Sequence, residues 1–262
     1  MRRLIVLSIA CAAFVLGLGA VRADAIVGGS TVPASSYPWL AAVGSPGFVT
    51  RDSGQFCGGA LVAPDKVLTA AHCVTDFEWF PWALRVQFGA SDLSKDKAQT
   101  VWADDVWIDP DFSTSSFQGT EVDHNDVAII ILDSKVNRPL APLVTADQTG
   151  LYQAGTLATI AGWGATSESD DSNTVLHQAQ VPLVADSGCQ ASYGSSFVAS
   201  QMVCAGLPQG GVDTCEYDSG GPLLINGVVA GITSWGKGCA EAGFPGTYAR
   251  LTSYLTTIRA HL

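Results

Sequence analysis

The sequence predicts an all-β fold, a sandwich or a barrel, from residue 26 onward. Its apolar runs are short, rich in Val, Ile, Thr and aromatic residues, and bounded by Gly, Pro, Asp and Ser. This is the pattern of strands joined by turns. With 262 residues and 47% hydrophobic content, the chain can form a full core in one large or two medium domains. The expected strands lie within residues 38–43, 56–62, 84–88, 127–132, 156–162, 175–183 and 228–235.

The first 25 residues have the composition of a secretory signal peptide. Two arginines precede an apolar run over 4–20, and residues 23–25 read Ala-Asp-Ala, a small-residue cleavage site. A single membrane anchor is the alternative, although the run is short for a span. Cleavage after Ala25 would expose Ile26 directly, whereas cleavage after Ala23 would leave a very short propeptide. We therefore expect a secreted, extracellular protein with no membrane segment after removal of the signal.

Acidic residues dominate the rest of the chain. Removal of residues 1–25 would leave 10 basic and 23 acidic residues, a net charge of −13. Such a surface repels the phosphates of DNA and RNA. We therefore expect no nucleic-acid partner.

Six cysteines remain after residue 25, which in an exported protein indicate three disulfides. No Cys-x-x-Cys spacing typical of zinc sites is present. We expect no metal site and no cofactor; a calcium site among the acids between Asp92 and Asp105 is the alternative to a solvated acidic face. Six cysteines allow 15 pairings. Pairing in chain order closes three short loops, and we expect the disulfides Cys57–Cys73, Cys189–Cys204 and Cys215–Cys239.

The chain is expected to divide near residues 137–142, where two prolines interrupt strand pairing. The last ten residues, 253–262, are the only stretch in which we find a helical pattern. Tyr254, Leu255, Ile258 and Leu262 fall on one face of such a helix.

Three polar residues stand in contexts that suit acyl-transfer chemistry. Ser219 lies in Asp-Ser-Gly-Gly-Pro, where glycines let the backbone bend tightly and bring its N–H groups close to a substrate. His72 ends an apolar stretch and suits a general base. Asp126 leads straight into a buried strand, where a carboxylate needs a partner such as an imidazole N–H. Each also has an ordinary structural alternative: a polar turn, a core histidine or a turn at the start of a strand.

Short motifs spread over essentially all of residues 26–262 resemble the chymotrypsin/trypsin family of serine proteases. They occur in the family's order: Ile-Val-Gly-Gly at 26–29, Leu-Thr-Ala-Ala-His-Cys at 68–73, Asn-Asp-Val-Ala at 125–128, Gly-Trp-Gly at 162–164, Asp-Ser-Gly-Gly-Pro at 218–222 and Ser-Trp-Gly at 234–236. The resemblance implies a serine endopeptidase, monomeric, with protein or peptide substrates and protein protease inhibitors as partners. It also implies two perpendicular six-stranded antiparallel β-barrels, over about 26–138 and 139–252, with a short C-terminal helix over about 253–262.

By the same resemblance, Ser219 is the nucleophile, His72 the general base and Asp126 the residue that orients His72. The backbone N–H groups of Tyr217 and Ser219 are expected to form the oxyanion hole. Once the preceding chain is removed, the amine of Ile26 is expected to pair with Asp218.

The resemblance further places Asp213 at the base of the primary substrate pocket. A buried carboxylate in an open slot selects Arg or Lys, so we expect cleavage after these residues. An ordinary turn residue is the alternative for Asp213. The other expected substrate-binding residues are Thr214, Ser234, Trp235, Gly236 and Gly246.

Two features depart from the family's pattern. Residue 25 is Ala rather than Lys or Arg, so a trypsin-like activator should not cut before Ile26. Tyr217 stands where the family usually has Gly, and its ring is expected to crowd the leaving-group side of the cleft.

Two alternatives to an active protease are considered: a catalytically weak homologue that acts as a binding or adhesion protein, and a hydrolase of esters or lipids. The second is disfavoured because no Gly-x-Ser-x-Gly motif surrounds Ser219.

Overall fold

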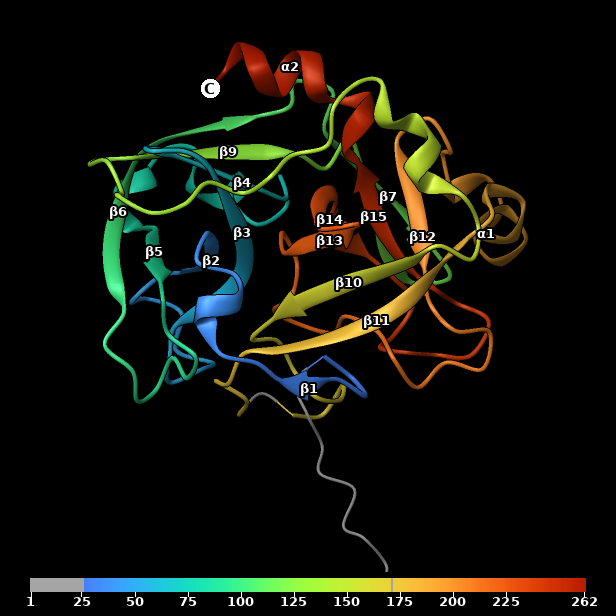
Figure 1. Ribbon diagram of the computed structural model, residues 1–262, viewed down its shortest axis with the longest axis horizontal. Coiled ribbons are helices and arrows are strands. Elements are labelled where there is room, and N and C mark those ends of the chain that lie inside the picture. The colour runs from blue at the N-terminus through green and yellow to red at the C-terminus, as the bar shows by residue number, and fades with distance from the viewer. Residues whose placement is uncertain (1–25, 171) are drawn as a thin grey trace, which may run out of the picture.

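The computed structural model describes residues 26–170 and 172–262, so the signal peptide and short propeptide predicted for residues 1–25 lie outside the described residues. The N-terminal half forms a closed antiparallel barrel in the strand order β2-β3-β4-β9-β6-β5. This barrel is the blue-to-green half of Figure 1. Its strands are β2 (Leu40–Gly44), β3 (Gln55–Ala63), β4 (Lys66–Thr69), β5 (Arg85–Phe88), β6 (Gln99–Ile108) and β9 (Ala128–Leu132).

The C-terminal half forms a second six-stranded antiparallel barrel. Strand β11 pairs with both β10 and β12, which closes the ring β11-β10-β13-β14-β15-β12. The short strand β1 (Ser30–Thr31) adds to the free edge of β11. The two barrels lie side by side, and the all-β fold with two six-stranded barrels is confirmed (Figure 1). The strands of the second barrel are β10 (Leu157–Gly162), β11 (His177–Val184), β12 (Met202–Ala205), β13 (Pro222–Ile225), β14 (Val228–Trp235) and β15 (Gly246–Arg250).

Apolar side chains of both barrels form one continuous core. Strands β4, β9 and β13 are buried along nearly their whole length, and one hydrophobic cluster joins Leu68 and Ile130 of the first barrel to Ile160 and Leu223 of the second. Burial of this apolar surface is the main term that stabilises the fold. The core fixes the barrels against each other, so that loops from both can contribute to one site.

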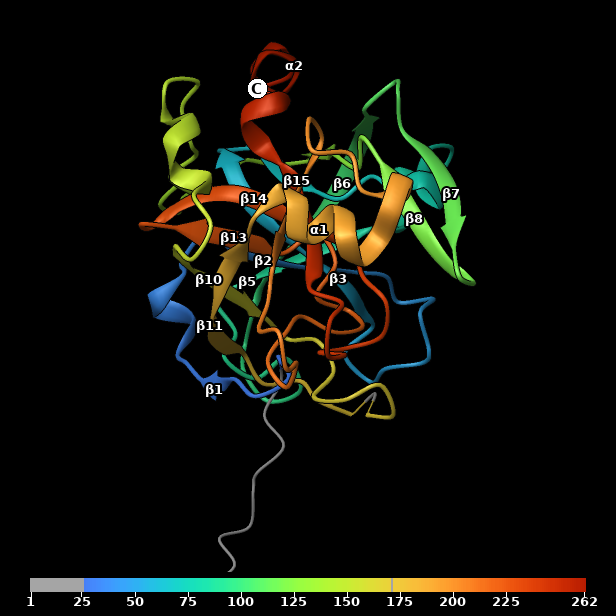
Figure 2. The ribbon, with the colours of Figure 1, turned by 90° about the vertical axis from the view of Figure 1, so that its right-hand side faces the viewer.

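The expected strands all lie within or overlap strands of the structure, but several other strands were not predicted from the sequence. Strand β6 was missed because its exposed face is polar, while Val101, Ala103 and Val106 point inward. The hairpin of β7 (Ser113–Phe117) and β8 (Thr120–His124) is mostly exposed and stands out at one side of the molecule (Figure 2). Its two-residue turn, Gln118-Gly119, has positive φ at both positions, as a type I′ turn requires.

The prediction of a single helix at the C-terminus was wrong, because α1 (Asp186–Tyr193) is also helical. Its sequence has weak helix propensity, with a glycine and two serines in eight residues. Tertiary structure overrides that propensity: Tyr193 is fully buried, its hydroxyl donates to the carbonyl of Pro245 at 2.7 Å, and the disulfide from Cys189 ties the helix to β12.

The C-terminal helix is confirmed but is shorter than expected. It is α2 (Leu255–Ala260), and Leu262, expected on its apolar face, is 45% exposed. The helix lies over one end of the N-terminal barrel (Figure 1). Directly after it, the ring of His261 stacks on Trp107 of β6. Short 3₁₀ helices occur at Ala34–Ser36, Thr75–Phe77, Pro81–Ala83, Gln148–Tyr152, Gly194–Ser196 and Leu251–Ser253.

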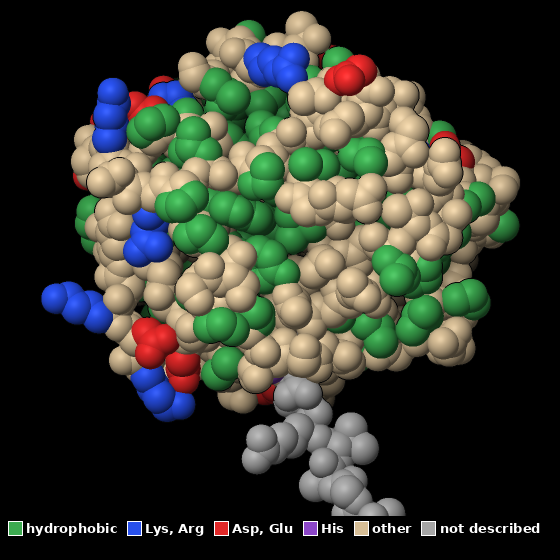
Figure 3. Space-filling model, in the orientation of Figure 1, with side chains coloured by type: hydrophobic (Ala, Val, Ile, Leu, Met, Phe, Trp, Pro, Cys, Tyr) green, Lys and Arg blue, Asp and Glu red, His purple; other side chains and the backbone are tan. Residues whose placement is uncertain are grey.

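Three disulfides link the six cysteines: Cys57–Cys73, Cys189–Cys204 and Cys215–Cys239. Among the helices of residues 26–170 and 172–262, none is long and apolar enough to cross a membrane. On the face viewed in Figure 3, charged side chains lie toward the edges, and the centre consists of hydrophobic and uncharged polar groups.

Candidate active site

His72 and Asp126 come from opposite ends of two paired strands and meet at the edge of the N-terminal barrel. His72 follows β4 and Asp126 precedes β9, and these strands pair antiparallel through Thr69 and Ala128. The ring Nδ1 of His72 lies 2.8 Å from Asp126 Oδ2, and the backbone N–H of His72 donates to Oδ1 at 3.0 Å. Ser234 Oγ of β14 also donates to Asp126 Oδ2, at 2.5 Å. The buried carboxylate of Asp126 therefore accepts hydrogen bonds at both oxygens, and its contacts with His72 orient the imidazole.

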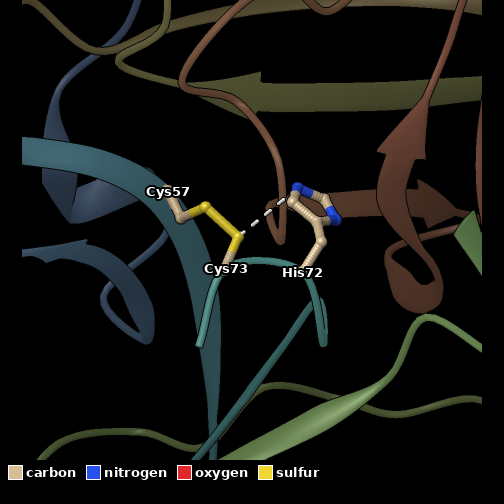
Figure 4. Close-up of side chains that lie close together, drawn as sticks. All are labelled: Cys57, His72 and Cys73. Carbon is tan, nitrogen blue, oxygen red and sulfur yellow. Dashed lines mark hydrogen bonds between the residues drawn. A yellow bond between two sulfur atoms is a disulfide. The ribbon is translucent and has the colours of Figure 1, made fainter. Parts of the chain in front are cut away.

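A disulfide stands directly beside the imidazole. Cys73 follows His72 in the chain and bonds to Cys57 of β3, and its Sγ lies 3.8 Å from His72 Nε2 (Figure 4). The bridge ties the backbone directly after the histidine to β3 of the barrel wall. It also leaves the two sulfurs without a thiolate for metal binding.

Sequence reasoning missed a second acid beside His72. The Oδ2 atom of Asp123, in β8, lies 3.6 Å from His72 Nδ1. Asp123 is buried, with an exposed fraction of 5%. None of the described residues hydrogen-bonds its Oδ1. Burial, and then the charge of Asp126, raise the pKa of Asp123 to about 7. The only sequence signal is two acids three residues apart, 123 and 126, which is too common to single out a site.

The acids outweigh the effect of burial on His72. Burial alone lowers the pKa of His72, but the charge and hydrogen bond of Asp126, followed by the charges of Asp123 and Glu121, raise the pKa above its ordinary value of 6.5. The imidazolium is therefore stabilised, as a base that must accept a proton during a reaction requires.

Replacing Asp123 with asparagine should shift the acid limb of the kcat/KM profile to lower pH by about one unit. Removing a negative charge near His72 destabilises the imidazolium, so its pKa falls and the neutral base is present at lower pH. The measurement is the pH dependence of kcat/KM on one amide substrate. Glu121→Gln is the control, because the exposed Glu121 should give a smaller shift. An unmoved acid limb in Asp123→Asn would show that Asp123 has no electrostatic role.

Ser219 sits in a tight loop that only glycines allow. Gly220 has a φ of +76°, and a Cβ there would lie 2.2 Å from Thr69 Oγ1. A Cβ at Gly221 would meet the carbonyl oxygen of Asp218 at 2.7 Å. The carbonyl of Ser219 accepts from the N–H of Gly58 in β3 at 2.7 Å. The loop is thereby pressed against the first barrel, and Ser219 and His72 line the same cavity.

Tyr217 adopts a backbone conformation that disfavours side chains, and a buried network holds it there. Its φ is +73°, in the left-handed region. Its carbonyl accepts from Gln55 Nε2 at 2.8 Å, and the same amide group also donates to the carbonyl of Cys57. Gln55 in turn accepts a hydrogen bond from Arg51, whose guanidinium lies 4.4 Å from the centre of the Tyr217 ring.

Arg51 was not found from the sequence, because the polar stretch around it is typical of a surface turn. In the structure its exposed fraction is only 3%, and it also donates to the carbonyl of Trp163 at 2.9 Å. A buried cation of this kind is retained only where several acceptors satisfy it.

Asp213 lies at the buried end of a second cavity that also reaches Ser219. The cavity has a volume of about 260 Å³, and its walls include Thr214, Ser234, Trp235, Gly236 and Gly246. Asp213 is 4% exposed and accepts the backbone N–H of Thr214 at 2.8 Å. A Cβ at Gly246 would lie 2.5 Å from Asp213 Oδ1, so any side chain there would close the slot. Burial raises the pKa of Asp213 to about 7, because its backbone and hydroxyl donors offset only part of the desolvation.

Asp218 points away from this cavity into the core behind the serine loop. Its carboxylate accepts the N–H groups of Gly164 at 2.8 Å and Cys215 at 3.1 Å. Burial raises its pKa to about 7, which marks a site that a nearby cation would stabilise. Ile26 is fully buried, and Val27 pairs with Asp213, five residues before Asp218 in the chain.

Asp92 and Asp96, two of the acids for which a calcium site was the alternative expectation, bind protein groups instead. In the β5–β6 loop, Asp92 accepts from Lys95 Nζ at 2.7 Å and from the hydroxyls of Ser94 and Thr174. The hydrogen bond from Lys95 is the main cause of an Asp92 pKa well below its usual range. Asp96 accepts two backbone N–H groups of the same loop. These contacts pin a loop that is otherwise exposed.

Comparison with known proteins agrees with this geometry. A family model described as Trypsin matches residues 26–258. A trypsin of Saccharopolyspora erythraea is 40% identical over 229 residues, which cover 87% of this chain and 94% of the relative. Trypsins of Squalus acanthias and Sus scrofa are each 33% identical over 239 residues, covering 90% of this chain and 95% of the relative. The chain therefore belongs to the trypsin family and is a serine endopeptidase.

Proposed function

We propose that the protein is a secreted, monomeric endopeptidase that cuts after Arg or Lys through a Ser219-His72-Asp126 triad. The observation that carries the specificity is the buried carboxylate of Asp213 at the closed end of a cavity that has Ser219 on its wall. A long cationic side chain placed in that cavity would bring the following peptide bond to the serine.

The proposed chemistry starts from His72, which Asp126 orients and which lines the same cavity as Ser219. Ser219 attacks the scissile carbonyl while His72 Nε2 accepts its proton, and the resulting imidazolium is held at Nδ1 by Asp126. The N–H groups of Tyr217 and Ser219 stabilise the oxyanion. His72 then protonates the leaving amine, the acyl-enzyme forms, and water repeats the sequence to release the acid product.

The Asp213 pocket selects cations because the carboxylate is poorly solvated. An arriving guanidinium or ammonium group replaces the lost solvation and favours the ionised form of Asp213. Apolar side chains would leave the charge uncompensated, and acidic ones would repel it.

A single cleavage after Ala25 would both complete secretion and activate the enzyme. The disulfides are typical of exported proteins, and cleavage by signal peptidase after Ala25 would free the amine of Ile26 to compensate Asp218. N-terminal sequencing of the secreted protein tests this, since a stable species that begins at Asp24 contradicts direct exposure of Ile26.

A set of chromogenic anilides that differ only in the residue before the amide tests the function. Arg and Lys anilides should be hydrolysed, whereas Phe and Glu anilides should be cleaved at least about 10²-fold more slowly. A serine-directed organophosphate should label Ser219 and abolish turnover. Absence of labelling would favour a binding homologue, and turnover of esters without amides would favour an esterase.

A further inference from the structure

The cavity that Ser219 shares with His72 is distinct from the Asp213 cavity, although Ser219 and Glu216 line both. It has a volume of about 580 Å³, and Ser219, His72 and the Cys57–Cys73 disulfide form its inner wall. A peptide whose residue before the cut lies in the Asp213 cavity must continue past His72, which protonates the leaving amine. The larger cavity therefore lies where the residues after the cut leave the catalytic centre.

Five aromatic rings line this cavity as a connected series. The ring of Tyr217 meets that of Phe48 edge-on, with 6.1 Å between centroids, and Phe48 meets Phe56 at 5.4 Å. Phe56 stacks on Phe77 with an interplanar angle of 3°, and Phe77 meets Phe80 edge-on at 5.7 Å. All five line the cavity. Such edge-to-face and stacked pairs hold each other in place, so the wall is preorganised.

The Tyr217 end of the series is fixed from behind by the Arg51–Gln55 network. Arg51 covers the Tyr217 ring, and Gln55 binds its carbonyl. The ring therefore serves as a wall of the cavity, and about 580 Å³ stays open in front of it. Asp76 and Glu216 supply the acidic groups of the lining.

We propose that this cavity is a specificity site for an aromatic side chain at one of the two positions after the cut. Aromatic rings present both faces and edges with which an entering Phe, Tyr or Trp can pair. Asp76 and Glu216 should make acidic residues the poorest occupants, through like-charge repulsion. This inference rests on the proposed function, because the Asp213 cavity must hold the residue before the cut for the larger cavity to hold a residue after it.

The test is cleavage of hexapeptides with Arg before the cut and Phe, Leu, Gly, Lys or Asp at each of the two following positions in turn. At one position, Phe should exceed Gly in kcat/KM by about 10-fold or more, with Asp slowest. Phe80→Ala and Phe77→Ala should reduce that preference by about 3- to 10-fold. Trp82→Ala is the matched control, because Trp82 lies on the same segment, is 68% exposed and is outside the cavity lining.

An N-acylated Arg primary amide, whose leaving group is ammonia, separates this proposal from the proposed function because nothing enters the cavity after the cut. Trp82→Ala should leave both the turnover of this amide and the preference for Phe in peptides unchanged. Equal rates for Phe and Gly at both positions, with the Arg amide still cleaved, would overturn the aromatic site alone. If the Arg amide is not cleaved, the same comparison in a library with all residues before the cut still tests the cavity.

Discussion

An Asp126→Asn variant is expected to lose about 10⁴ in kcat, with KM little changed. Asp126 accepts both the ring Nδ1–H and the backbone N–H of His72. An amide NH₂ facing Nδ1 would instead hold the imidazole in the tautomer with its proton on Nε2, which cannot accept the proton of Ser219. The measurement is kcat on an Arg anilide, corrected for the concentration of folded enzyme.

Asp186→Asn is the matched control, because Asp186 pairs with Arg250 at the surface of α1 and should not affect turnover. A loss of less than tenfold in Asp126→Asn would contradict the triad. Asp123 is a second acid beside the same Nδ1, so adding Asp123→Asn measures how much of the residual activity depends on it.

Replacing Asp213 with serine should lower kcat/KM for Arg and Lys substrates by about 10³ and leave apolar substrates unchanged or faster. The substrate cation would lose its counter-charge at the buried end of the cavity. The measurement is the ratio of kcat/KM values for Arg and Phe anilides. In the wild-type enzyme, KM for Arg should also fall as the pH rises through the Asp213 pKa of about 7, since only the ionised carboxylate attracts the cation.

Glu216→Gln is the control for this experiment, because Glu216 lines the same cavity but is exposed, and its charge is screened by solvent. It should change the ratio only a few-fold. Unchanged selectivity for Arg and Lys in Asp213→Ser would rule out the pocket assignment.

The parts of the site that the sequence predicted are those carried by local motifs. His72, Asp126 and Ser219 each stand in a short stretch that fixes its own backbone, as Gly220 and Gly221 do for the serine loop. Asp123, Arg51 and Gln55 have no such stretch, and they reach the site only through tertiary packing. The same holds for α1, whose weak propensity is overridden by a buried tyrosine and a disulfide.

The pinned β5–β6 loop bears on how the enzyme survives its own activity. If the enzyme cuts after Arg and Lys, as proposed, it is also a substrate for itself. Of the exposed basic residues, Arg259 lies in α2, and Lys135 directly precedes the buried Val136. Lys95 and Lys97 are exposed in the β5–β6 loop. The carboxylates of Asp92 and Asp96 hold this loop in its folded conformation through hydrogen bonds within it. Under that specificity, Lys95 and Lys97 are expected to be early sites of autolysis, and loss of the Asp92 and Asp96 contacts should speed it.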